Sequence, residues 1–329
     1  MQILSNMLLI ISTNKVLDNL KLNFDENGLW ALYIALAVIM FGVSLEITIA
    51  DFKRLSKNPR LVFIGIFSQF IVFPLITFAL INIISPIPSI ALGMILVAAC
   101  PGGNISNFLT HLSGGNTALS VSLTAFATLV AIVMTPINLQ FWGNLYEPTA
   151  QILRDVELNP FELTKLVTLI LGIPLLLGMI FRSQKPVMAK KIAKVLKPVS
   201  VAILMLFIAV AFYNNLDIFL EYIHYVIFIV ILHNFSGLLG GFYFAKAMKL
   251  RYYNQKTLAL ETGIQNSGLG LLLVFAFFDG LGGMALCVAF WGIWDILSGL
   301  VIAYYWSKAS LTTVKKSSNL PEAEEINSF

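Results

Sequence analysis

Residues 261–268 read Glu-Thr-Gly-Ile-Gln-Asn-Ser-Gly, and they lie inside one of the most apolar stretches of the chain. A carboxylate at the centre of a membrane costs about 2.5–3.5 kcal/mol on insertion scales. The glycines at 263 and 268 weaken the helix around Glu261. A charged residue beside an interrupted helix at membrane depth is typical of transporter ion sites. This stretch therefore predicts a broken membrane helix that binds an ion.

A second stretch of the same kind lies in the first half of the chain. Residues 100–107 read Cys-Pro-Gly-Gly-Asn-Ile-Ser-Asn, and a proline followed by two glycines breaks the helical hydrogen-bond ladder. One break in each half is typical of an inverted-repeat transporter whose binding site lies at the repeat interface. The alternative is that these residues only kink packed helices, which membrane helices tolerate. The carboxylate and amides of the second break favour the functional interpretation.

The composition indicates a membrane protein. Of the 329 residues, 58% are hydrophobic and only 12% are charged, and the mean hydropathy is +0.86. Soluble domains contain about 25% charged residues. A spanning helix needs about 20 apolar residues, so we expect an all-α polytopic protein. The nine predicted spans are 29–49, 61–84, 88–112, 117–142, 162–181, 197–213, 224–247, 256–278 and 283–306.

The distribution of basic residues predicts the orientation. If nine spans alternate, seventeen Lys and Arg fall on one side, and Lys15, Lys21, Arg154 and Lys165 on the other. The positive-inside rule then puts the N-terminus outside and the C-terminus in the cytoplasm of a multi-pass protein of the cell (inner) membrane. A ten-span alternative requires the short apolar patch 3–11 to cross. We expect an extracellular or interfacial segment at 1–28, a transmembrane region at 29–306 and a disordered cytoplasmic tail at 307–329.

Polar residues within the spans suit a hard cation such as sodium, which prefers oxygen ligands. Glu261 and Gln265 are four residues apart and share a helix face, as do Ser120 and Thr124. Hydroxyls in membrane helices also bond back to carbonyls one turn earlier, and a buried amide such as Gln69 also joins helices. The three histidines are isolated and the two cysteines imply no disulfide, so we expect no transition-metal site. We also expect no enzyme, because the sequence lacks a paired nucleophile and base.

The two breaks, together with Phe41-Gly42 and Leu45, resemble the bile acid:sodium symporter family over about residues 36–307. The resemblance implies a core domain of spans 2–4 and 7–9, in which the two broken helices cross. It also implies a panel domain of spans 1, 5 and 6. The family transports organic anions, either bile salts or small carboxylates such as pantoate.

The resemblance also implies the site residues. A first sodium site would be formed by Ser106, Asn107, Ser120, Thr124 and Glu261. A second would be formed by Gln69, Glu261, Gln265 and the backbone carbonyls of Thr262 and Ile264. The substrate-binding residues would be Asn104, Asn266 and Asp295. Related bacterial proteins have a histidine at the position of Asp295, and an aspartate facing the cleft disfavours an anion.

Together with the resemblance, these observations predict a symporter that uses two sodium ions to carry an organic anion, either bile-salt-like or a small carboxylate, by alternating access. The alternative is a proton-coupled or arsenite-type efflux transporter in which Glu261 carries a proton. We expect the lipid bilayer as a partner, no nucleic acid, and a monomer or homodimer. Asp295 has two open roles, as a buried structural carboxylate or as a selector of the solute.

Overall fold

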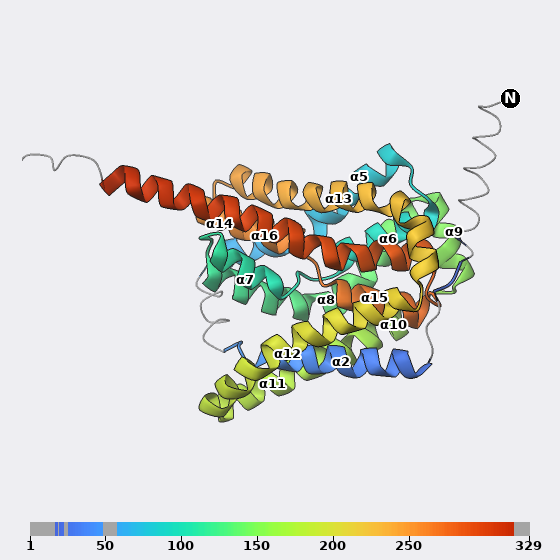
Figure 1. The fold of residues 1–329 in the computed structure, drawn as a ribbon, viewed down its shortest axis with the longest axis horizontal. Coiled ribbons are helices and arrows are strands. Elements are labelled where there is room, and N and C mark those ends of the chain that lie inside the picture. The colour runs from blue at the N-terminus through green and yellow to red at the C-terminus, as the bar shows by residue number, and fades with distance from the viewer. Residues whose placement is uncertain (1–16, 19, 23–25, 49–57, 319–329) are drawn as a thin grey trace, which may run out of the picture.

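The computed structural model describes residues 17–18, 20–22, 26–48 and 58–318, and the apolar patch 3–11 lies outside them. Within these residues the chain is helical, with two isolated β-bridges and no strand (Figure 1). The elements of the first half are α2 (Glu26–Ser44), α4 (Pro59–Phe67), the π-turn η1 (Ser68–Val72), α5 (Phe73–Ile84), α6 (Pro88–Ala99), α7 (Ile105–Leu112), α8 (Thr117–Leu145) and α9 (Glu147–Asp155). The elements of the second half are α10 (Pro160–Val167), the π-turn η2 (Thr168–Gly172), α11 (Ile173–Gln184), α12 (Pro186–Tyr213), α13 (Leu216–Ala247), α14 (Tyr252–Gly263), α15 (Ser267–Phe277) and α16 (Gly282–Ser318).

Proline determines where several helices begin and where two of them change their winding. The helices α4, α6, α10 and α12 each begin at a proline, because this residue has a helical φ and needs no partner for an N–H group. Pro74 and Pro174 are the second residues after the ends of η1 and η2. Each π-turn lies within a long helix, at the point where a proline removes a backbone hydrogen bond. The sequence analysis did not predict these two turns.

Several of the described helices can cross a bilayer. Five are long and apolar enough: Pro59–Ile84, Thr117–Leu145, Pro160–Gln184, Leu216–Ala247 and Gly282–Lys308. Three apolar helices are shorter: Gly28–Ser44, Pro88–Ala99 and Ser267–Phe277. Large apolar side chains such as Phe63, Ile83 and Phe228 lie on the surface, where lipid would cover them. The protein is thus an all-α membrane protein, and the count of nine spans stays a prediction.

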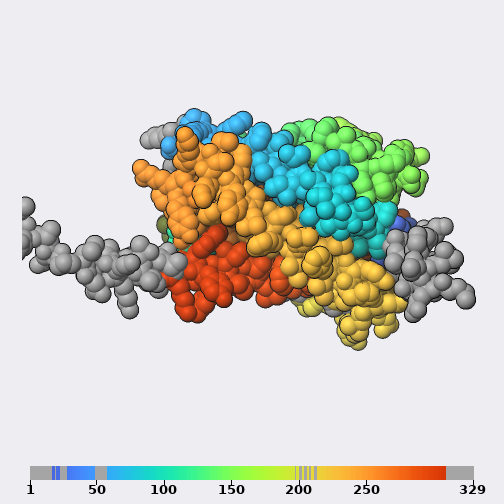
Figure 2. Space-filling model, turned by 90° about the horizontal axis from the view of Figure 1, so that it is seen from above, coloured from blue at the N-terminus to red at the C-terminus, as the bar shows by residue number. Residues whose placement is uncertain are grey.

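The helices form two groups in Figure 1. The helices α2, α11 and α12 pack against one another at the bottom of the view. The other group is built around α13, which contacts α5, α14 and α16, and Figure 2 shows α13 running across one face between α16 and the segment around α5. The two groups meet where α2 contacts α15, and where η2, in the same long helix as α11, contacts α8. The two breaks lie in the larger group, close to this boundary.

The described part of the N-terminal segment is packed against the larger group. Leu17 is fully buried, and the Asp18 Oδ1 accepts a hydrogen bond from the Ser89 N–H at 2.8 Å, in the first turn of α6. The Gly282 N–H donates to the Leu20 carbonyl at 2.6 Å, at the start of α16. These contacts hold together the first turns of two helices that are far apart in the sequence.

Three features differ from the prediction. The sequence analysis missed α9. The helix α16 runs to Ser318, past the predicted end of the last span at residue 306; no glycine or proline occurs between Gly299 and Pro321 to end the helix. Lys256, one of the seventeen basic residues assigned to the cytoplasmic side, is buried, and its Nζ donates to the Ser113 carbonyl at 2.8 Å.

Candidate functional site

The two breaks cross each other and pair as a short antiparallel bridge between Gly102 and Gln265. The Gly103 N–H donates to the Ile264 carbonyl at 2.8 Å, and the Asn266 N–H donates to the Pro101 carbonyl at 2.9 Å. A broken helix leaves backbone groups without partners, and burying them unpaired is costly. Each break therefore provides hydrogen-bond partners for the other.

Glycine is required at this crossing because the two backbones approach closely. A Cβ atom at Gly103 would lie 2.7 Å from the Gln265 carbonyl oxygen, and one at Gly102 would lie 3.0 Å from the Glu261 carbonyl oxygen. Both neighbours are backbone atoms, which cannot rotate away. The Gly-Gly pair is thus a requirement of close approach and does not act only as a helix breaker.

Four helix ends meet at the crossing. The helices α6 and α14 end there at Ala99 and Gly263, and α7 and α15 begin there at Ile105 and Ser267. Helix C-terminal ends present carbonyl groups and carry partial negative charge, whereas N-terminal ends present N–H groups and carry partial positive charge. The crossing therefore offers one environment for a cation and another for an anion, as in transporters with discontinuous helices.

Glu261 is buried in a shell of hydroxyl groups. Its Oε1 accepts hydrogen bonds from Ser106 Oγ at 2.6 Å and from Ser120 Oγ. Its Oε2 accepts a hydrogen bond from Thr124 Oγ1 at 2.9 Å. The Asn107 Oδ1 lies against the same two hydroxyls, at 2.8 Å from Ser120 Oγ and 3.2 Å from Thr124 Oγ1. The structure thus brings together all five residues predicted for the first sodium site.

This first group has the chemistry of a hard-cation site. All the side-chain atoms that face one another are oxygens, and one of them carries a negative charge. Each hydroxyl has one proton to donate, and its oxygen lone pairs remain as potential ligands for a cation. The Thr124 Oγ1 also lies 3.0 Å from the Ser120 carbonyl, so back-bonding competes with the contact to Glu261 for its one proton.

In the second group, Gln69, Gln265 and the Thr262 carbonyl are joined by amide N–H donors, whereas the carboxylate oxygens of Glu261 accept hydrogen bonds from the first group. Gln69, which lies within the π-turn η1, donates from Nε2 to the Cys100 carbonyl at 2.9 Å and to the Gln265 Oε1 at 2.8 Å. The Gln265 Nε2 donates to the Thr262 carbonyl at 2.7 Å, and the Ile264 carbonyl faces Gly103. A cation at this position needs oxygen ligands. Sodium binding would therefore require the side-chain amides of Gln69 and Gln265 to rotate.

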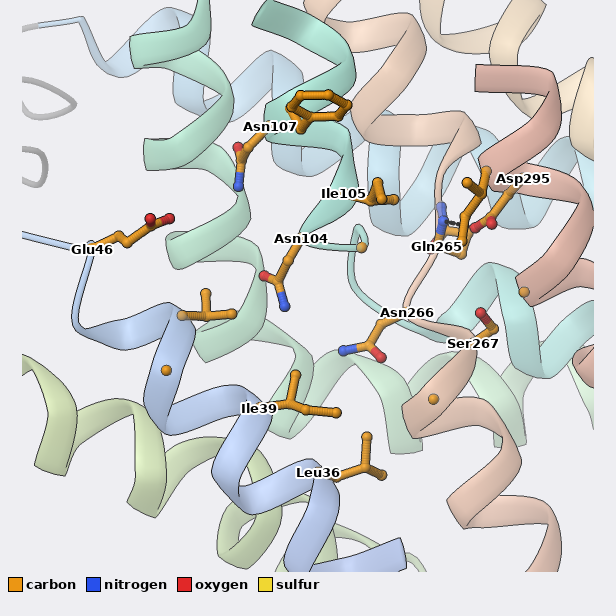
Figure 3. Close-up of a pocket in the computed structure, with 17 residues that line it drawn as sticks. Leu36, Ile39, Glu46, Asn104, Ile105, Asn107, Gln265, Asn266, Ser267 and Asp295 are labelled. Carbon is orange, nitrogen blue, oxygen red and sulfur yellow. Dashed lines mark hydrogen bonds between the residues drawn. The ribbon is translucent and has the colours of Figure 1, made fainter. Parts of the chain in front are cut away.

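A cavity of about 330 Å³ lies between α2, the crossing and α16 (Figure 3). All three residues predicted to bind substrate, Asn104, Asn266 and Asp295, line it. The remaining lining residues are Leu36, Ile39, Gly42, Val43, Glu46, Gly103, Ile105, Asn107, Phe108, Gln265, Ser267, Gly268, Gly292 and Ile296. Asn107 and Gln265 also belong to the two groups of predicted sodium ligands, so the cavity and those groups share residues.

Asp295 combines features of both predicted roles. It is 2% exposed, and its Oδ2 accepts a hydrogen bond from the Gln265 N–H at 3.3 Å. This bond satisfies a backbone group of the unwound segment, which is a structural role. Asp295 also lines the cavity, as a residue that selects the solute would.

Comparison with known proteins identifies the family. The model of the sodium bile acid symporter family matches residues 33–222. The chain belongs to this family. The resemblance drawn from the two breaks is thereby confirmed.

Relatives in the family share most of the length of the chain. The uncharacterized sodium-dependent transporter YocS of Bacillus subtilis (strain 168) is 37% identical over 289 residues, which are 87% of each chain. The ileal sodium/bile acid cotransporter of Oryctolagus cuniculus is 32% identical over 242 residues, 72% of this chain and 67% of the relative. A probable chloroplastic sodium/metabolite cotransporter of Arabidopsis thaliana, BASS1, is 27% identical over 84% of this chain and 67% of its own length. Sodium-dependent transport is thus the activity of the family.

In this family member, sequence reasoning missed one charged residue of the cavity. Glu46 lies just beyond the end of α2 and lines the same cavity as Asp295. The available signal was its position directly after Leu45, the last residue of the motif quoted for the resemblance. Ser267, at the start of α15, was also missed, although it lies within the motif at 261–268.

Proposed function

We propose that the protein is a sodium-coupled symporter that carries a small carboxylate-bearing solute by alternating access. The observation that carries this proposal is the oxygen shell around Glu261, beside a cavity that shares residues with it. Membership of a sodium-dependent transporter family supports it independently. The cavity volume of about 330 Å³ is near the lower end of ligand pockets, which favours a small carboxylate over a bile-salt-like solute.

Coupling between ion and solute follows from shared structure. A sodium ion at Glu261 and Asn107 would fix the first turn of α7, and a second at Gln69 and Gln265 would fix the segment before α15. Both segments line the cavity, so sodium would complete the surface that the solute contacts. By thermodynamic linkage, the solute would tighten sodium binding by the same factor.

The two groups of helices supply a physical basis for alternating access. We assign α2, α11 and α12 to the panel and the group around the crossing to the core, and the cavity lies where α2 faces the core. Movement of one group against the other would open the cavity first to one side of the membrane and then to the other.

Sodium-specific stabilisation tests this function. Sodium, but not potassium at equal ionic strength, is expected to raise the melting temperature of the purified protein, because a ligand of the native state stabilises it by about 2.7 kcal/mol at one hundred times its dissociation constant. A sodium gradient should also drive solute uptake into proteoliposomes. Equal stabilisation by potassium would contradict the proposal. Uptake driven by a proton gradient without sodium would favour the proton-coupled alternative.

Side-specific labelling tests the proposed orientation, with the N-terminus outside and the C-terminus in the cytoplasm. The exposed residues Asp155 and Lys190 flank the single long helix Pro160–Gln184. Single cysteines at 155 and 190 are expected to react with an impermeant reagent from outside and inside the cell, respectively. The native Cys100 and Cys287 are buried and give little background. Labelling of both positions from one side would contradict the proposed topology.

A further inference from the structure

The charged side chains that line the cavity are both acidic. They are Glu46, beyond the end of α2, and Asp295, on α16 (Figure 3). Among the described residues that line the cavity there is no Lys, Arg or His. Like charges brought together disfavour binding, so this cavity is poorly suited to a solute that carries only negative charge.

The part of the cavity between these acids presents hydrogen-bond donors. The Asn266 Oδ1 accepts a hydrogen bond from the Leu269 N–H at 3.0 Å, which turns the Nδ2 of this side chain away from the helix. Figure 3 shows the amide groups of Asn104 and Asn266 directed into the space beside Ile39. The helices α7 and α15 begin directly after Asn104 and Asn266. Amide N–H donors and helix N-termini favour a carboxylate.

From this arrangement we infer that the solute is a small aliphatic zwitterion, with a carboxylate and a positively charged amine. The inference rests on the proposed symport function and specifies its substrate class. The carboxylate is placed at Asn104 and Asn266, and the amine is placed at Glu46 or Asp295, which lie on opposite sides of Asn104 in Figure 3. Leu36, Ile39 and Val43 of α2 line the cavity and contact the aliphatic part. An ammonium group also compensates the burial of the Asp295 carboxylate.

Matched pairs of solutes test the inference by thermal stabilisation in sodium. Each pair differs only in the amine: alanine or β-alanine against propionate, 4-aminobutyrate against butyrate, and 6-aminohexanoate against hexanoate. At least one amine-bearing solute is expected to stabilise the protein at a concentration about tenfold lower than its partner, because a charge-assisted hydrogen bond contributes that much or more. Stabilisation by sodium alone is measured first. If sodium alone does not stabilise the protein, that result contradicts the symport function; it does not contradict the substrate class.

Two variants locate the amine, with a third as a control. Glu46→Gln or Asp295→Asn is expected to reduce the preference for the amine-bearing solute about tenfold, while sodium alone still stabilises each variant and thus shows that it is folded. Asp155→Asn removes an exposed acid that does not line the cavity and should leave the preference unchanged. The inference is overturned if the simple carboxylates stabilise as well as their amine partners, if no amine-bearing solute of the series stabilises the sodium-bound protein, or if both variants keep the full preference.

Discussion

Replacement of Glu261 by glutamine is expected to abolish sodium-dependent stabilisation while the protein remains folded. The amide keeps an oxygen that can accept from Ser106 and Ser120, so the packing around the crossing is preserved. The variant loses the negative charge that balances the ion. An ion pair at about 4 Å contributes about 4 kcal/mol at an effective dielectric constant of 20, so the affinity for sodium should fall about a hundredfold or more. Titration of the melting temperature with sodium measures this loss, and sodium-driven uptake should vanish with it.

An exposed glutamate provides the matched control. Glu147 lies on α9 and forms a surface ion pair with Arg154 at 2.8 Å. Glu147→Gln makes the same chemical change away from the crossing, and it should retain the full sodium response. If sodium stabilises the Glu261→Gln variant as strongly as the Glu147→Gln variant, Glu261 is not part of the sodium site.

The parts of the site that follow from local sequence were predicted. Proline and glycine at 101–103, and glycines on either side of Gln265, indicate breaks without knowledge of the fold, because their effect on a helix is local. The oxygen chemistry of Glu261, Ser120 and Thr124 is likewise visible from residue types and spacing. The assembly of the first group around Glu261 was implied by the family resemblance, and the hydrogen bonds now show which atoms meet.

Other parts depend on distances between segments and were not predictable. The pairing of Gly103 with Ile264 joins residues from the two halves of the chain, and no local pattern shows which backbone groups meet. Gln69 reaches the Cys100 carbonyl and the Gln265 Oε1 from within the π-turn η1, a turn that the sequence did not predict. Glu46 belongs to the cavity because α2 packs across the crossing. Its sequence position alone places it at the end of a membrane helix, where charged residues are common.

The second large effect is expected from the addition of a single methyl group at the crossing. In Gly103→Ala, the new Cβ would lie 2.7 Å from the Gln265 carbonyl oxygen and 3.1 Å from the Gln265 carbonyl carbon. Relief of this overlap requires the two backbones to separate, which stretches the bond from the Gly103 N–H to the Ile264 carbonyl. Overpacking against fixed atoms costs about 1–3 kcal/mol. A weakened buried hydrogen bond adds about 1 kcal/mol.

Gly240→Ala is the matched control, because it adds the same methyl group where no backbone atom is close. It separates the effect of overlap at the crossing from the general effect of alanine in place of glycine. A Cβ at Gly240 in α13 meets chiefly the Ile76 Cδ1, the end of a flexible side chain that can rotate away, and alanine favours a helix over glycine by about 1 kcal/mol. Gly240→Ala should therefore keep or slightly raise the melting temperature. Gly103→Ala should lower the melting temperature and also weaken sodium binding, because the displaced segment leads into Ser106 and Asn107. The opposite result is that the two variants have the same melting temperature and the same affinity for sodium. In that case the crossing tolerates separation of its backbones, and their pairing does not position the ligands around Glu261.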